Sequence, residues 1–155
     1  MPQFRGHKPP KRTPGNTALN APESPLLWHQ LPNAPSVGSA LGNVDAIGDG
    51  QALMQTVFGA TDPLQPASQA APFHVLLLRS GSEVKAFVNR CAHFGVPLAA
   101  QQSLLKYVPH TSLTCNVHYA RYRWSDGVCD RGDCEGESLI AIPVTQDADG
   151  CIRIA

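Results

Sequence analysis

The chain has 155 residues, 43% of them hydrophobic, which is enough for one compact core but not for two domains of ordinary size. Twelve basic and twelve acidic residues cancel, so no overall charge draws the protein to nucleic acid or to an anionic membrane. The strongest apolar run, at residues 75–78, is far shorter than the roughly 20 residues needed to span a bilayer. We therefore expect a single domain with no nucleic-acid or membrane partner.

The first 25 residues have the composition of a tail. More than half of the fourteen prolines lie within residues 1–35, and no acidic residue precedes Glu23. Such a segment buries too little apolar surface to fold, so residues 1–25 are predicted to be a disordered, basic, proline-rich tail and residues 26–155 the folded domain. No apolar segment follows the basic residues of this tail, so we predict no secretory signal and expect a cytoplasmic protein.

From residue 26 onward the sequence consists of short β-like runs broken by turn residues, with hardly any helical period. The clearest feature is a hairpin, in which residues 80–82 (SGS) join two runs rich in Val, Leu and Phe. Residues 59–72 contain three prolines and are predicted to form a surface loop. The expected fold class is therefore all-β. The predicted strands are residues 26–31, 52–58, 73–79, 83–89, 113–115, 121–124, 139–144 and 152–154.

Two Cys/His pairs are the candidate functional residues. Cys91 and His93 have the spacing C-x-H, Cys115 and His118 have the spacing C-x-x-H, and 21 residues (94–114) separate the pairs. Each pair follows a predicted strand, so a turn can bring its thiolate and its imidazole to the same side. Two such loops side by side would supply four ligands to a metal centre. A reducing cytosol also favours metal or redox chemistry over a disulfide framework for the five cysteines.

Both loops resemble those of Rieske ferredoxins. The first loop is residues 89–98 (NRCAHFGVPL) and the second is residues 115–122 (CNVHYARY). The flanking pattern is similar as well, so the resemblance covers roughly residues 26–155. It implies a Rieske-type antiparallel β-sandwich with a small cluster-binding subdomain formed by two loops.

The resemblance also implies the cofactor, a Rieske-type [2Fe–2S] cluster. Cys91 and Cys115 would hold the inner iron, and His93 and His118 the outer iron near the surface. Replacing two anionic thiolates by neutral imidazoles raises the reduction potential above that of an all-cysteine cluster. The alternative is a single structural zinc ion held by the same four residues, although the C-x-H spacing departs from the pairs usual in zinc sites.

Three positions depart from the family pattern. The gap between the two pairs is a few residues longer than usual, which indicates an insertion around residues 104–111. Tyr119 stands where the family usually has Gly, so that turn must accept a bulky side chain. Gly132 is followed by Asp where many members have Gly-Pro, in a third loop that normally shields the cluster. This loop also holds Cys129 and Cys134, which could pair if oxidised but are expected to be free thiols in a cytosol.

The resemblance implies a function in electron transfer. The expected partners are a flavoprotein reductase, which supplies an electron, and a terminal oxygenase or similar enzyme, which receives it. We find no Gly-rich dinucleotide fingerprint and no room for a catalytic iron domain, so no catalytic activity of its own is expected. The alternative is a small Rieske subunit or docking module of a larger redox complex, similar to the small subunit of assimilatory nitrite reductase.

Overall fold

The computed structural model describes residues 25–59 and 70–155 of the chain. Within these residues all strands pair antiparallel, and the only helical segments are three single 3-10 turns at Trp28–Gln30, Val44–Ala46 and Gln102–Leu104. The expected all-β class is confirmed. The predicted tail lies outside the described residues except for Pro25, and so does most of the predicted loop at 59–72.

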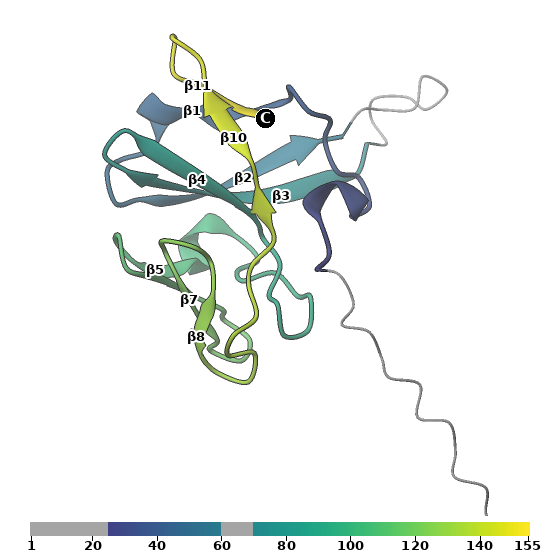
Figure 1. Cartoon of the computed structure of the whole chain (residues 1–155), viewed down its shortest axis with the longest axis vertical. Helices are drawn as coiled ribbons and strands as arrows, with labels where there is room; N and C mark the ends of the chain where they lie inside the picture. The colour runs from purple at the N-terminus through teal and green to yellow at the C-terminus, as the bar shows by residue number, and fades with distance from the viewer. Residues whose placement is uncertain (1–24, 60–69) are drawn as a thin grey trace, which may run out of the picture.

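Three antiparallel sheets make up the described part of the chain (Figure 1). The first has the order β1-β11-β10, the second β2-β3-β4-β9 and the third β5-β6-β7-β8. The strands are β1 (Ala40–Asn43), β2 (Ala52–Phe58), β3 (Pro72–Ser80), β4 (Glu83–Val88), β5 (Lys106–Val108), β6 (Ser112–Thr114), β7 (Arg121–Arg123), β8 (Cys129–Arg131), β9 (Ala141–Ile142), β10 (Val144–Gln146) and β11 (Cys151–Ile154).

The sheet β2-β3-β4-β9 is the middle layer, and its strand β3 is buried on both faces. Leu76 and Leu78 belong to the hydrophobic core shared with the sheet β5-β6-β7-β8. Val75 and Leu77 belong to a second core, shared with β1 and β11. Strands covered on both faces are continuously apolar instead of alternating, which explains the unbroken apolar run at residues 75–78.

The central position of β3 gives a direct prediction for stability. Leu77 is fully buried in the core away from the two Cys/His loops. Leu77→Ala should lower the free energy of unfolding by about 2–5 kcal/mol, because it leaves a cavity that the sheets cannot collapse around. The matched control is Leu104→Ala, since Leu104 is 48% exposed and should lose far less. Urea denaturation of both variants checks this, and equal losses would contradict the two-core description.

The sheet β5-β6-β7-β8 forms a smaller lower part of the molecule, separate from the two other sheets (Figure 1). The loop with Cys91 and His93 follows β4, and the loop with Cys115 and His118 joins β6 to β7. Both loops contribute to the core between this sheet and the middle layer, in which Cys91 and Cys115 are buried. The structure therefore has the small two-loop subdomain that the resemblance implied.

Several predicted boundaries are wrong for local reasons. Residues 26–31 do not form a strand, because the Gln30 N–H donates to the Leu27 carbonyl at 3.0 Å and closes a 3-10 turn. The predicted strand at 139–144 is divided into β9 and β10 at Pro143, a residue that has no N–H to donate. Three strands, β1, β5 and β8, were not predicted; each is only three or four residues long. In the region of the predicted insertion, β5 pairs with β6.

Candidate metal centre

The first loop is held by backbone hydrogen bonds that begin and end at Cys91. The Cys91 N–H donates to the Val96 carbonyl at 2.6 Å, and the Cys91 carbonyl accepts from the Gly95 N–H at 2.9 Å. Gly95 has φ +68°, a conformation that glycine adopts at little cost. The side chain of Arg90 packs where a Cβ of residue 95 would lie. The loop thus turns back on itself and encloses His93.

The second loop repeats the same scaffold. The Cys115 N–H donates to the Ala120 carbonyl at 2.9 Å, and the Cys115 carbonyl accepts from the Tyr119 N–H at 3.0 Å. Tyr119 has φ +60° and so occupies the position that Gly95 occupies in the first loop. Its side chain is exposed, which explains how this turn accepts a bulky residue where the family pattern has glycine.

The positive φ of Tyr119 predicts how substitutions there affect stability. A left-handed conformation costs an ordinary residue about 1–2 kcal/mol and is rarer still for a β-branched one. Tyr119→Val should therefore unfold more easily than Tyr119→Gly by about 1–2 kcal/mol, with little contribution from lost packing because Tyr119 is exposed. Thermal denaturation of the two variants, side by side, checks this. If the valine variant is as stable as the glycine variant, residue 119 does not adopt this conformation in solution.

Two asparagines join the loops to their surroundings. The buried Asn89 side chain donates to the Ala99 carbonyl at 3.0 Å and accepts from the Leu98 N–H at 2.9 Å, which closes the base of the first loop. The Asn116 N–H in the second loop donates to the Leu98 carbonyl at 2.9 Å. Neither asparagine was predicted to have a role, because its hydrogen-bond partners can be identified only from the three-dimensional structure.

The four predicted ligands lie in two layers. Cys91 and Cys115 are buried in the same hydrophobic core, at the inner end of the loops. His93 is half-buried and His118 is exposed, and their ring centroids are 5.3 Å apart. The structure brings all four residues together, with sulfur inside and imidazole outside. Their role as ligands stays a prediction.

The surroundings of the two sulfurs have opposite net effects on their pKa values. Burial opposes ionisation of Cys91, but the Tyr122 hydroxyl and the backbone N–H groups of His93 and Phe94 hold its pKa below the ordinary value. Burial raises the pKa of Cys115, although the backbone N–H groups of Val117 and His118 oppose the shift. Each sulfur thus meets the N–H groups two and three positions further along its own loop. Donors of this kind would stabilise thiolates that bind iron.

Tyr122 connects the first loop to the third, residues 132–137. Its hydroxyl oxygen accepts from the Ala92 N–H at 3.0 Å and lies 3.1 Å from the Cys91 sulfur. The same oxygen lies 3.3 Å from the sulfur of Cys134 in the third loop. Burial raises the pKa of Tyr122, so the phenol keeps its proton and can donate to a sulfur. The contact with Cys134 was not predicted, since nothing in the spacing of the cysteines indicates it.

Gly132 lets the third loop approach the second one closely. Its φ is +118°, and a Cβ at this position would lie 3.0 Å from the Cα of Ala120. The loop therefore covers the second loop without the proline that follows this glycine in many relatives. The third departure from the family pattern therefore does not prevent the third loop from packing against the second.

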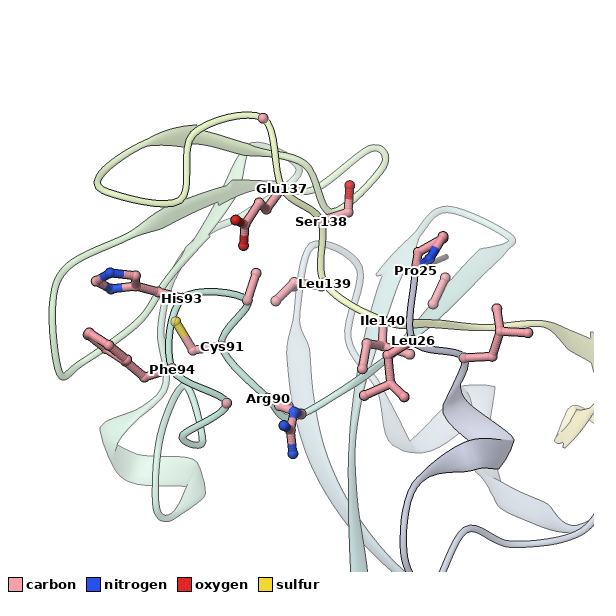
Figure 2. A pocket seen from close by; sticks show the side chains of 15 residues that line it. Pro25, Leu26, Arg90, Cys91, His93, Phe94, Glu137, Ser138, Leu139 and Ile140 are labelled. Atoms are coloured by element: carbon pink, nitrogen blue, oxygen red, sulfur yellow. The ribbon is translucent and has the colours of Figure 1, made fainter. Parts of the chain in front are cut away.

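A groove of about 930 Å³ lies beside the first loop and has residues 25–27 and 136–141 on its other walls. Figure 2 shows Cys91, His93 and Phe94 at one end of the groove, and Leu26 with Ile140 at the other. The imidazole side of the site is thus open to this groove.

The donor set fits a two-iron cluster. The Nδ1 atom of His93 is buried and has no hydrogen-bond partner in the protein, as expected for a nitrogen reserved for a metal. Among the described residues, no three His, Cys, Asp or Glu side chains are placed to hold one metal ion. A two-iron cluster does not require such a group, because it takes two protein ligands on each iron.

Comparison with known families decides the assignment. The family model described as the Rieske [2Fe-2S] domain matches residues 40–145. The chain belongs to the Rieske [2Fe–2S] family. The expected cofactor, a Rieske-type [2Fe–2S] cluster, follows from this membership, which does not support the alternative of a structural zinc ion. A search of curated proteins found no match.

Several solved structures have the same fold. The ferredoxin of carbazole 1,9a-dioxygenase from Nocardioides aromaticivorans IC177 is 19% identical with a TM-score of 0.53, over 77% of this chain and 98% of that one. The terminal oxygenase of carbazole 1,9a-dioxygenase from Novosphingobium sp. KA1 is 19% identical with a TM-score of 0.56, over 77% of this chain and 30% of that one. A reduced complex between oxygenase and ferredoxin of carbazole 1,9a-dioxygenase gives 23% identity and a TM-score of 0.55, over 77% of this Rieske chain and 28% of the matched chain. This chain thus spans less than a third of the matched chains in the oxygenase structures.

The described residues contain no helix that is long and apolar enough to cross a membrane.

Proposed function

We propose that this Rieske protein is a one-electron carrier whose cluster is held by Cys91, His93, Cys115 and His118. When bound, the cluster supplies a site that takes up and releases one electron. The observation that carries the proposal is the layered arrangement of the four residues, with buried sulfurs and an exposed imidazole edge. The chain's own residues protect the sulfur side from water and leave the histidine side open for a partner.

The surface around the histidines supports docking of another protein. Phe94, Val117 and Tyr119 are all more than half exposed although they are large and apolar. The Phe94 ring lies 3.9 Å from the His93 ring and 5.1 Å from the His118 ring, measured between centroids. An apolar rim around a polar centre is typical of a protein interaction site. A partner seated on this rim would come close to the outer iron.

We infer that the partners are a flavoprotein reductase and an oxygenase-type terminal enzyme. The structural likeness extends over 98% of a dioxygenase ferredoxin but over only 28–30% of the chains matched in the oxygenase structures. The fold shared with a ferredoxin over nearly its whole length supports the proposed carrier. The alternative is a small subunit or docking module of a larger redox complex, which would use the same exposed rim.

The test of the proposed function is spectroscopic and electrochemical. We expect the purified protein to contain two irons and two acid-labile sulfides, and to show the visible and EPR spectra of a Rieske cluster. Coulometric titration should take up one electron per chain. A colourless protein that binds one zinc and no sulfide would end this proposal, whereas elution with a large partner from the native source would favour the docking module.

A further inference from the structure

Two cysteines outside the proposed ligand set form a close pair in the part of the structure that bears β8 and the third loop. Cys129 and Cys134 are 1% and 2% exposed, and their sulfurs are 3.1 Å apart. Backbone hydrogen bonds hold both residues, from the Gly136 N–H to the Cys129 carbonyl and from the Glu137 N–H to the Cys134 carbonyl, each at 2.9 Å. A disulfide needs about 2.05 Å between sulfurs, so an approach of about 1 Å would close the bond.

This pair contacts the proposed cluster site through Tyr122. The Cys134 thiol donates to the Cys129 sulfur, and the Cys129 thiol donates to the Arg131 carbonyl. Cys134 then has no proton left for Tyr122, so its sulfur can only accept from the hydroxyl. Tyr122 has one hydroxyl proton and two sulfur acceptors, Cys91 at 3.1 Å and Cys134 at 3.3 Å. In the dithiol state the two sulfurs compete for that proton.

We propose that Cys129 and Cys134 are a redox modification site, at which a peroxide closes a disulfide and thereby assigns the Tyr122 proton to Cys91. This inference rests on the proposed function, because it takes Cys91 to be a cluster ligand. Closing the pair moves the Cys134 sulfur toward Cys129 and removes it as an acceptor for Tyr122. A stronger hydrogen bond to a ligand sulfur stabilises the reduced, more negatively charged cluster, so the midpoint potential rises.

The chemistry balances with hydrogen peroxide as the oxidant. The Cys134 sulfur, which lies 3.1 Å from the Cys129 sulfur, attacks the peroxide. Its S–O bond forms as the peroxide O–O bond breaks, which gives a sulfenic acid and one water. The Cys129 sulfur then forms the S–S bond and displaces the sulfenic oxygen as a second water. Two thiols are oxidised, one peroxide is reduced, and both thiol protons end in water.

The test uses the cluster-loaded protein, titrated with hydrogen peroxide. Mass spectrometry of the trapped protein should show the loss of two hydrogens, with the disulfide mapped to Cys129 and Cys134. Voltammetry should show a more positive midpoint potential after closure, reversed by a dithiol reductant. Cys151→Ser is the matched control, because Cys151 lies in β11 and should change neither result. Cys134→Ser should lose both responses.

Tyr122→Phe separates a hydrogen-bond effect from a merely structural one. This variant should still form the disulfide but should show no shift of potential on closure. The proposal is overturned if the cluster bleaches before any disulfide forms, if the disulfide forms without a positive shift, or if the shift persists in Tyr122→Phe. A protein without cluster spectra overturns the proposed function itself, and the mass measurement then shows by itself whether the two cysteines pair.

Discussion

Replacing His93 or His118 by Ala should abolish the normal two-iron, two-sulfide content, because the outer iron loses one of its two protein ligands. The fold should survive in both variants. His118 is exposed and His93 half-buried, and neither belongs to the two hydrophobic cores. Iron and sulfide assays with EPR spectra would measure the loss, and circular dichroism would show whether the sheets remain.

The matched control is His110→Ala, a histidine in the same small subdomain. His110 lies in the β5–β6 turn, where its Nδ1 is 3.0 Å from the Ser80 hydroxyl, and it should not affect the cluster. Cys91→Ala and Cys115→Ala should lose the cluster as well, with an added loss of stability because both sulfurs are buried in the core. Full cluster content in any of the four variants would show that the ligands are wrongly chosen.

Much of the fold was predictable because the pattern that specifies it is local. The hairpin of β3 and β4 was predicted from two apolar runs and a short Ser-Gly-Ser turn, and the structure pairs Val75 with Val88 as expected for such a hairpin. The strands that were missed are short and depend on tertiary pairing. In β1, for example, Gly42 marks a bulge opposite β11, a partner more than a hundred residues away. No local pattern identifies a partner at that distance.

In the candidate site, too, the local features could be predicted from the sequence and the tertiary contacts could not. Residue type and spacing are sufficient to predict the four candidate ligands, and a departure from the family pattern is sufficient to predict the strained turn at Tyr119. The hydrogen bonds that hold the loops are different, because they join residues from separate elements. Asn116 reaches the carbonyl of Leu98, and Tyr122 lies between Cys91 and Cys134. Such contacts depend on how the loops pack, so they required the structure.

The reduction potential is the second large effect that the sequence and the structure predict together. Rieske relatives from cytochrome bc-type complexes carry a pair of cysteines that form a disulfide between the two loops, and a serine hydroxyl that bonds a bridging sulfide. The resemblance places Val96, Val117 and Ala120 at the corresponding positions, so we expect neither the disulfide nor the hydroxyl. Hydrogen bonds to the cluster sulfurs favour the reduced state, and their absence lowers the potential.

Tyr122 keeps one of these hydrogen bonds, because its hydroxyl lies 3.1 Å from the Cys91 sulfur. With Cys129 and Cys134 as thiols, we therefore expect a low-potential centre, near the lower end of the range of about −150 to +300 mV found for Rieske clusters. Such a centre suits a flavoprotein reductase as electron donor and not a quinol. Tyr122→Phe should lower the potential further, since it removes this donor while leaving the ring in the core.

Protein-film voltammetry near neutral pH tests both expectations on the same electrode. The unaltered protein and Tyr122→Phe should each give a reversible one-electron wave, with the variant at the more negative potential. Tyr107→Phe is the matched control, because Tyr107 lies in β5 and has no hydrogen bond to either cysteine among the described contacts. A midpoint above roughly +100 mV would contradict the low-potential centre, because it lies in the upper half of the family range. An unchanged potential in Tyr122→Phe would show instead that the phenol does not donate to Cys91.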